Sequence, residues 1–600
     1  MASAGSNDWM GEIDRPNLPG EYPLGWKSDV AAEMLRQLDI PYVALNPGAS
    51  YRGFHDSLVN YLGNRAPQMI VCLHEDHVVA IAHGYAKATD KPMGAILHSN
   101  VGLMHGLMGL FNAFCDRVPM MVIGATGPVA PEKRRPWIDW IHTTKDQAAM
   151  LRNYIKWDDE PRSVPGVIEA FLRGYQMTVT KPSAPVYICL DAGLQEEGVS
   201  GEITFPDVAR YVPMTLPAAA AADVRTVVDL VKHAKTPVFM FGRGSREQRH
   251  WEARVEVAEL AGASVMSSQR ERAVFPTQHG LHVLPPMGSL SPAAKELLAG
   301  ADLIVSFDYP DLQGTLRQVN RNTGAIAAKV VKVSLDHTLH NGWSMDYFGL
   351  PPADLAIMAD PDAFAEQLRD ELSAQLGGVK RWDGRSRRTW GEIGYSENAD
   401  VELVSRDIEV ALAEVRGERK FTLTHLSFGW DGRAYHWNDP LDYLGHDGGA
   451  GLGAGPGLAL GAALALKDQG RTVISVDGDG DFMQGATALW TAAHHQIPAL
   501  FVINNNRSNF NDEIHQEAVA KDRKRPPENK WIGMRISEPN VDIAALARSQ
   551  GVEAEGPVTD RQSLLAALER GLAVVASGKP YLIDVLVKPS YANKLVTRGD

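Results

Sequence analysis

Residues 473–481 of this 600-residue chain read VISVDGDGD, and residues 499–506 read ALFVINNN. Each stretch is a short apolar run that ends in polar residues, and a helical pattern over 486–495 separates the two. This succession predicts two parallel strands of one sheet joined by a helix. Because ligands bind beyond the carboxyl ends of parallel strands, the polar residues at the two strand ends are expected to share one site.

The residues that end these two strands suit a divalent cation and a diphosphate. Asp479 offers a carboxylate and Asn506 an amide oxygen, both hard ligands of the kind that Mg²⁺ prefers. Gly478 and Gly480 let the backbone approach phosphate oxygens, and the N-terminus of the next helix favours negative charge. A plain turn after a strand is the alternative for such a cluster. An EF-hand is excluded, since the loop lacks its sixth-position Gly and twelfth-position Glu.

The same alternation of apolar runs and helical patterns extends from about residue 30 to about residue 590. The predicted strands are 69–73, 93–97, 120–123, 186–190, 238–241, 303–307, 330–333, 473–476 and 500–503. Two polar stretches, 198–222 and 376–396, are predicted as linkers. We therefore expect an α/β fold of three consecutive domains, each a mainly parallel sheet flanked by helices, over residues 25–197, 220–375 and 397–592.

Composition narrows the class of protein. The net charge is −14 and the one basic run is 521–525, which argues against binding nucleic acid through its phosphates. Three sparse cysteines without metal-ligand spacing indicate a reducing compartment. Residues 1–23 are polar, and no apolar run approaches 18 residues. The expectation is a cytoplasmic protein without a membrane span.

Gly-Asp-Gly at 478–480, followed about 25 residues later by paired asparagines, resembles the cofactor signature of the thiamine-diphosphate (ThDP) decarboxylase and acetolactate synthase superfamily. The resemblance implies ThDP and Mg²⁺ as cofactors, with Asp479, Asn506 and the backbone carbonyl of Ser508 on the metal. Arg507 stands where members usually have glycine. The resemblance also implies the roles of the three domains, which would be pyrimidine-binding, middle and diphosphate-binding.

Three further segments carry the resemblance. Residues 74–86, HEDHVVAIAHGYA, resemble the segment of the cofactor-activating glutamate, which implies that role for Glu75. Residues 97–99 and 275–279 resemble the two active-site histidine segments of benzoylformate decarboxylases. They imply an acid/base pair of His98 and His279, since imidazole titrates near neutral pH. Residues 450–453, AGLG, resemble the wedge segment, which implies that Leu452 bends the cofactor.

The substrate side departs from benzoylformate decarboxylases. Ala49 stands where those enzymes have a catalytic serine, and the adjacent Ser50 is expected to point elsewhere. The segment after the metal ligands is polar, and its candidates for substrate contact are Asn511, Glu513 and His515. By helical spacing these side chains either face solvent or pair with polar atoms of a small-molecule substrate.

The resemblance implies cleavage or formation of a carbon–carbon bond next to a carbonyl, above all non-oxidative decarboxylation of a 2-oxo acid or carboligation. A 2-hydroxyacyl-CoA lyase stays open, and Gly242-Arg-Gly244 does not decide it. An acetolactate-synthase-like enzyme without FAD and a non-catalytic ThDP-fold binding protein also stay open. In the family, glutamate and diphosphate site come from different subunits. A homodimer or homotetramer with sites at the subunit interface is therefore expected.

Overall fold

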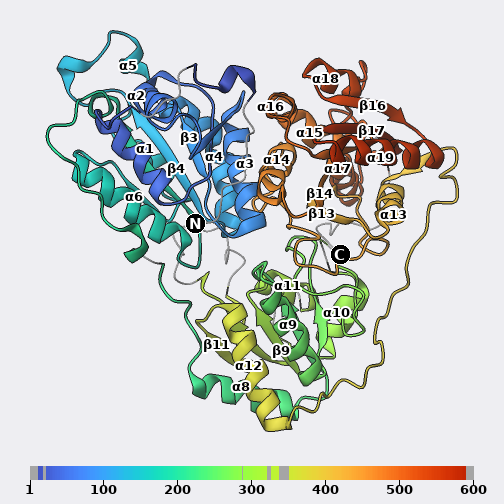
Figure 1. Ribbon diagram of the computed structural model, residues 1–600. Helices are drawn as coiled ribbons and strands as arrows, with labels where there is room; N and C mark the ends of the chain where they lie inside the picture. The colour runs from blue at the N-terminus through green and yellow to red at the C-terminus, as the bar shows by residue number, and fades with distance from the viewer. Residues whose placement is uncertain are drawn as a thin grey trace.

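The computed structural model describes residues 11–17, 22–211, 213–286, 288, 290–320, 326–336 and 350–589. These residues form three α/β domains in chain order, which confirms the predicted fold class. The N-terminal domain (blue to cyan) and the C-terminal domain (orange to red) lie side by side, with the middle domain (green to yellow) below them (Figure 1). Within the described ranges, no helix combines the length and the apolar character that crossing a membrane requires.

The N-terminal domain contains a parallel sheet in the strand order β2-β1-β3-β4-β6-β5. Its strands are β1 (Tyr42–Leu45), β2 (Gln68–Val71), β3 (Gly94–Leu97), β4 (Met120–Thr126), β5 (Trp157–Asp159) and β6 (Pro185–Asp191). Its helices are α1 (Lys27–Gln37), α2 (Arg52–Asp56), α3 (Glu75–Thr89), α4 (Ser99–Cys115), α5 (Ile138–Ile141), α6 (Val164–Val179) and α7 (Ala192–Gln195). Helices α1 and α6 pack in the core on one face, and α3 and α4 in the core on the other. Apolar central strands are thereby covered on both sides.

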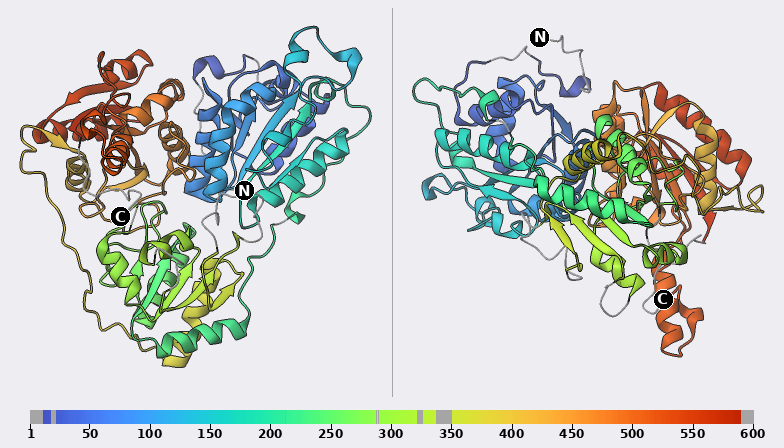
Figure 2. Two further views of the ribbon diagram at one scale, coloured as in Figure 1. Left: turned by 180° about the vertical axis from the view of Figure 1, so that it is seen from behind. Right: turned by 90° about the horizontal axis from the view of Figure 1, so that it is seen from below.

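The middle domain has a five-stranded parallel sheet in the order β11-β10-β9-β7-β8. Its strands are β7 (Pro237–Phe241), β8 (Ser264–Met266), β9 (Leu303–Phe307), β10 (Lys329–Val333) and β11 (Leu355–Ile357). Its helices are α8 (Ala221–His233), α9 (Gln248–Ala261), α10 (Pro292–Ala299), α11 (Leu312–Val319) and α12 (Pro361–Leu376). The segment after α12 runs along the outside of the molecule to the C-terminal domain (Figures 1 and 2).

The C-terminal sheet has the order β12-β17-β15-β14-β13, with β16 also paired to β17, and every pairing is parallel. Its strands are β12 (Leu403–Val404), β13 (Lys420–His425), β14 (Arg471–Gly478), β15 (Leu500–Asn505), β16 (Glu553–Val558) and β17 (Tyr581–Lys588). Its helices are α13 (Ser405–Arg416), α14 (Gly455–Leu466), α15 (Asp479–Gly485), α16 (Ala488–His495), α17 (Phe510–Asp522), α18 (Ile543–Ser549) and α19 (Arg561–Ala576).

Helices α3 and α14 join the N-terminal and C-terminal domains through direct backbone contact. A Cβ atom on Gly84 would lie 2.1 Å from the carbonyl oxygen of Leu458, and one on Gly461 would lie 1.9 Å from that of Ile81. Only glycine allows so close an approach. Buried apolar residues of both domains merge into one core across this contact. The N-terminal ends of the two helices are therefore fixed relative to each other.

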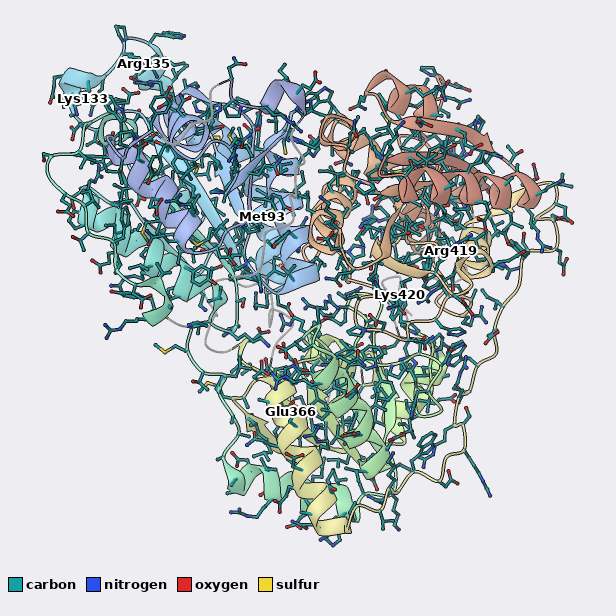
Figure 3. All side chains as sticks on the ribbon, viewed as in Figure 1. Met93, Lys133, Arg135, Glu366, Arg419 and Lys420 are labelled. Atoms are coloured by element: carbon teal, nitrogen blue, oxygen red, sulfur yellow. The ribbon has the colours of Figure 1, made fainter. Side chains whose placement is uncertain are left out.

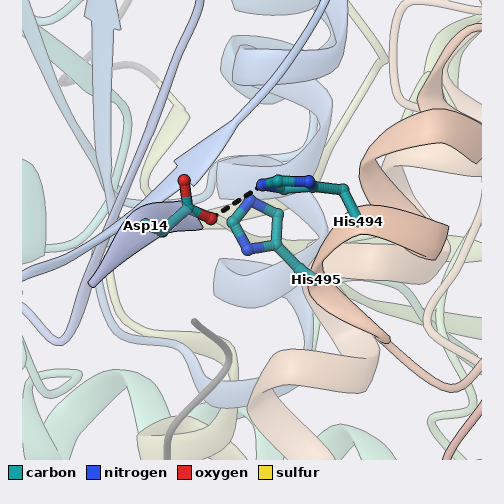
Figure 4. A group of neighbouring side chains, drawn as sticks. All are labelled: Asp14, His494 and His495. Atoms are coloured by element: carbon teal, nitrogen blue, oxygen red, sulfur yellow. Dashed lines mark hydrogen bonds and ion pairs between the residues drawn. The ribbon is translucent and has the colours of Figure 1, made fainter. Parts of the chain in front are cut away.

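A second contact between these domains involves the end of α16 (Figure 4). The carboxylate of Asp14 lies 2.7 Å from Nε2 of His494, whose ring stacks on Trp490. Nε2 of the neighbouring His495 accepts a hydrogen bond of 2.9 Å from the backbone N–H of Val71, the last residue of β2. Polar contacts thus supplement the shared apolar core.

Buried Arg246 joins all three domains. It belongs to the middle domain, and its Nε donates to the carbonyl oxygen of Lys87 at 3.0 Å. Its two terminal nitrogens donate to the carbonyl oxygens of Pro440 and Leu444 at 3.0 and 3.1 Å. Since Lys87 is N-terminal and the other two acceptors are C-terminal, one guanidinium satisfies buried carbonyls from both neighbouring domains.

Candidate active site

Glu75 is the first residue of α3, and its side chain is buried at the end of β2. Oε1 accepts from Nδ2 of Asn46 at 3.0 Å, and Oε2 lies 3.1 Å from Nδ1 of His105. A Cβ atom on Gly102 would come within 2.8 Å of Oε1, so α4 has room for no side chain at this position beside the carboxylate. Burial raises the pKa of Glu75, but the bonds from Asn46 and His105 outweigh this and leave the pKa below its usual value.

Asp479 begins α15 directly after β14, and Asn506 follows the end of β15. Because Gly478 pairs with Asn504 in the sheet, the two strand ends are neighbours. The carboxylate of Asp479 is 3% exposed, its Oδ2 has no hydrogen-bond partner, and burial raises its pKa to about 6. A buried carboxylate oxygen without a donor calls for a cation, so the residues present fit Mg²⁺.

Arg507 occupies the position where relatives usually have glycine, and its backbone shows why. Its φ is 55°, in the left-handed region that disfavours side chains other than glycine by about 1 kcal/mol. Two hydrogen bonds hold the turn. The N–H of Arg507 donates to Oδ1 of Asn505 at 3.2 Å, and its carbonyl accepts from Ile536 at 2.8 Å. These two bonds hold the backbone between Asn506 and Ser508 in this path with an arginine at the left-handed position.

Leu452 lies at the tip of a turn just before α14, and 44% of this large apolar residue is exposed. The turn itself is held on both sides. Gly451 exchanges hydrogen bonds of 3.1 and 3.3 Å with the side chain of Asn112 on α4, and the N–H of Gly453 donates to Asp481 at 2.6 Å. An apolar side chain held rigidly in the open fits the wedge role implied for Leu452.

The sequence reasoning missed a buried histidine beside the Gly-Asp-Gly turn. His425 ends β13, and its Nε2 lies 2.9 Å from Oδ2 of Asp481 and 3.9 Å from Oδ1 of Asp477. Burial lowers the pKa of His425, but these two carboxylates outweigh that effect and raise it to about 10. A positive charge is thereby held behind the turn. Nothing in the local sequence around His425 marks it, since its partners lie more than 50 residues away.

His98 lies at the end of β3 and is half-buried. The structure corrects the expectation that Ser50 points elsewhere, because Oγ of Ser50 lies 2.9 Å from Nδ1 of His98. Ala49, the other residue in question, is exposed.

The ring of His142 stands perpendicular to that of His98 with centroids 4.8 Å apart. Burial and the nearby His142 together lower the pKa of His98. His142 follows α5, at the outer end of the N-terminal domain where Lys133 and Arg135 lie (Figure 3).

His279 is bound within the middle domain. Its Nε2 lies 3.3 Å from Glu259 of α9, its Nδ1 accepts from the N–H of Leu281, and its ring packs on Trp382. In the part of the chain that the structure describes, no hydrogen bond or ring contact joins His279 to the N-terminal domain. The contacts within one chain do not bring His98 and His279 together, and their pairing stays a prediction.

The polar residues of α17 do not behave as one group. Glu513 is fully buried, accepts from Oγ of Ser508 and lies 2.7 Å from Nε of Arg535. The expectation that Glu513 faces solvent or substrate is therefore wrong, because a residue 22 positions later neutralises it. His515 is exposed, whereas Asn511 is half-buried and its Oδ1 has no partner. Of the three candidates, Asn511 alone keeps a buried polar atom available.

Gly242-Arg-Gly244 follows β7 at the end of the sheet where a nucleotide would bind in this type of fold. Arg243 forms ion pairs with two carboxylates at this end of the sheet. Nε lies 2.9 Å from Asp308, and a terminal nitrogen lies 2.7 Å from Asp336. A Cβ atom on Gly242 would lie 2.0 Å from the carbonyl oxygen of Asp308. Gly242 is thus required by close packing against Asp308, and the two ion pairs of Arg243 occupy the place where a nucleotide would bind.

Comparisons with known proteins agree with this geometry. Residues 26–150, 224–368 and 427–585 match the N-terminal TPP binding domain, the central domain and the C-terminal TPP binding domain of thiamine pyrophosphate enzymes. Benzoylformate decarboxylase of Pseudomonas aeruginosa is 26% identical over 573 residues, covering 92% of this chain and 97% of that protein. Acetolactate synthase 2 of Nicotiana tabacum is 26% identical over 596 residues, covering 93% and 82%.

Among solved structures, benzoylformate decarboxylase from Polynucleobacter necessarius superposes with a TM-score of 0.77 at 18% identity, covering 95% of this chain and 100% of that one. This likeness concerns the fold. With all three domains matched in order, the chain belongs to the ThDP-dependent decarboxylase and acetolactate synthase superfamily of thiamine pyrophosphate enzymes.

Proposed function

We propose that this chain is a ThDP- and Mg²⁺-dependent enzyme that decarboxylates a 2-oxo acid without oxidation and can join the product to a second carbonyl compound. Relatives that match nearly its whole length are benzoylformate decarboxylase and acetolactate synthase, so the chain is a ThDP enzyme acting on carbon–carbon bonds. The observation that carries the proposal is the buried carboxylate of Asp479, whose free oxygen lies beside the end of β15.

The residues on both sides of the site have distinct tasks in this proposal. Asp479, Asn506 and the carbonyl of Ser508 would hold Mg²⁺, and the backbone at Gly478 and Gly480 would receive the diphosphate. Glu75 would bind the pyrimidine ring, and Leu452 would support the bent shape of the cofactor. Bound ThDP supplies the electron sink that the breaking bond requires. Nε2 of His98 would donate a hydrogen bond to the oxygen of the substrate carbonyl.

We also propose that the site is completed in a homodimer or homotetramer. The hydrogen-bond partners of Glu75 among the described residues, Asn46 and His105, both belong to its own domain. A row of exposed apolar side chains follows one face of α4 near the wedge turn: Val101, Met104 and Met108. A patch of this kind commonly marks a protein contact. The three free cysteines favour a cytoplasmic location.

A substrate panel tests the proposed reaction. The purified protein, supplied with ThDP and Mg²⁺, is offered benzoylformate, polar 2-oxo acids and 2-hydroxyacyl thioesters, while CO₂ and aldehyde release are measured. CO₂ release from at least one 2-oxo acid, lost in Asp479→Ala, is expected. Aldehyde release from thioesters alone would replace the proposal by a lyase. Activity equal in wild type and Asp479→Ala would contradict the metal site.

Carboligation is the second candidate, because several relatives are acetolactate synthases. Adding an aldehyde or a second 2-oxo acid as acceptor and measuring the acyloin product distinguishes it from simple decarboxylation. The thioester lyase is less favoured, since Arg243 and its two carboxylate partners occupy the nucleotide position of the middle domain.

A further inference from the structure

Ser50 contacts His98 with two different groups. Its backbone N–H donates to Nδ1 of His98 at 3.3 Å, and its Oγ lies 2.9 Å from the same nitrogen. The ring is pressed closely against the preceding turn, since a Cβ atom on Gly48 would lie 2.3 Å from the side chain of His98. Ser50 itself is 3% exposed. The arrangement is therefore fixed by packing and by hydrogen bonds.

The direction of these bonds follows from the donors. A backbone N–H can only donate, so Nδ1 of His98 must present its lone pair to Ser50. The hydroxyl oxygen of Ser50 in turn accepts from the backbone N–H of Ser99 at 3.2 Å, which leaves the hydroxyl proton free to point to Nδ1. The backbone N–H and the hydroxyl of Ser50 therefore both donate to Nδ1 of His98, which must be unprotonated. The proton of the neutral ring must then be on Nε2.

We propose that Ser50 is a positioning residue that holds His98 in the tautomer with its proton on Nε2, which makes Nε2 of the neutral ring a hydrogen-bond donor to the substrate. The inference rests on the proposed function only for the partner of that N–H. Protonation of Nδ1 would turn an acceptor into a donor, which would leave the backbone N–H of Ser50 without its acceptor and force the hydroxyl to turn its own proton away from the ring.

Charged and titratable groups around His98 come from several elements. His142 after α5 stands against the ring, and Tyr51, beside Ser50, faces it with centroids 6.3 Å apart. Arg135 also disfavours the charged ring, whereas Glu75 favours it. Burial, His142 and Arg135 thus act in the same direction as the Ser50 contacts and hold the pKa of His98 below its usual value. The phenol of Tyr51 stays neutral, because burial and Glu75 raise its pKa.

The role predicted for Ser50 differs from that of a nucleophile or a substrate ligand. The hydroxyl is buried and donates its hydrogen bond to Nδ1 of His98, so it cannot donate to a substrate at the same time. Its removal should leave the substrate contacts in place. The fraction of His98 that carries the proton on Nε2 should fall, and the pKa of His98 should rise because one opposing donor is gone.

Hydrogen exchange at the carbon between the two ring nitrogens tests this without substrate. The rate of exchange in D₂O depends on imidazole protonation, so the mass of the His98 peptide measured across pH gives a midpoint for this one histidine. The full-length protein is compared with Ser50→Ala and Ser50→Thr. Ser563→Ala, which removes a hydroxyl bound to Asp560 at the N-terminus of α19 in the C-terminal domain, is the control for loss of a serine hydroxyl.

We expect the midpoint of His98 to move to higher pH in Ser50→Ala and to stay near wild type in Ser50→Thr and Ser563→Ala. His233 and His515 should keep their midpoints in every variant. The acidic limb of the activity profile should move in the same direction as the exchange midpoint. Ser50→Cys, with a weaker donor, should fall between Ser and Ala and replaces Ser50→Ala if that variant does not fold.

An unchanged midpoint in Ser50→Ala, or an equal shift in Ser50→Thr, would overturn the inference. The outcome is separable from the proposed reaction. A shifted midpoint with no activity on any substrate of the panel would retain the role of Ser50 and reject the reaction. An unshifted midpoint with normal decarboxylation would do the reverse.

Discussion

Replacing Arg246 by methionine should weaken the junction of the three domains strongly. Methionine keeps the apolar stem but leaves the carbonyl oxygens of Lys87, Pro440 and Leu444 without their donor. Each unpaired buried carbonyl costs about 1–3 kcal/mol, and release of the buried guanidinium returns part of that sum. We therefore expect the free energy of unfolding to fall by about 3–5 kcal/mol.

Urea unfolding followed by tryptophan fluorescence measures this loss, and Arg249→Met is the control. Arg249 lies three residues further along the chain, is 61% exposed and pairs with Glu247 at the surface. Such a pair contributes about 0–1 kcal/mol, so its loss should hardly move the transition. Equal unfolding curves for the two variants would show that the carbonyl contacts of Arg246 carry little energy.

Three further predictions concern the site. Glu75→Gln should retain ThDP in calorimetry but lose about 10²-fold or more in turnover, and turnover within twofold of wild type would remove Glu75 from catalysis. Asp479→Ala should lose Mg²⁺-dependent binding of ThDP, which unchanged affinity would contradict. Since burial raises the pKa of Asp479 to about 6, protons should compete with Mg²⁺ below that pH. Cofactor affinity in wild type should thus fall as pH drops from 7 to 5, and a flat profile would count against Asp479 as a ligand.

The sequence was sufficient for the parts of the fold that depend on local pattern. All nine predicted strands are present, and β9 has the predicted bounds. Eight strands in the described part of the chain were not predicted: β1, β5, β8, β11, β12, β13, β16 and β17. Of these, β1 and β17 are apolar over most of their length. The strand ends at Gly478 and Asn505 were placed side by side because parallel-sheet geometry requires it.

The parts of the site that depend on distant partners could not be derived in this way. Ser50 and His98 are 48 residues apart, and the sequence offers no signal that they touch. The same holds for Glu513, whose burial depends on Arg535. His105 was not predicted as a site residue, although it lies seven residues after His98 on α4. A histidine on a helix that is otherwise largely apolar was the signal that could have indicated its contact with Glu75.

The merged core of α3 and α14 makes the covalent connection between α12 and the C-terminal domain dispensable once folding is complete. The segment with the exposed Gly391 and Gly394 has no heavy atom within 4 Å of a Cβ placed on either glycine, so a protease can reach it without disturbing packed structure. After a cut there, the two pieces remain held by the interlocked helices and by the contacts of Arg246. A nicked molecule should elute as one particle from a sizing column and separate into two fragments only in denaturant. The C-terminal domain would then behave as a subunit bound non-covalently to the other two domains.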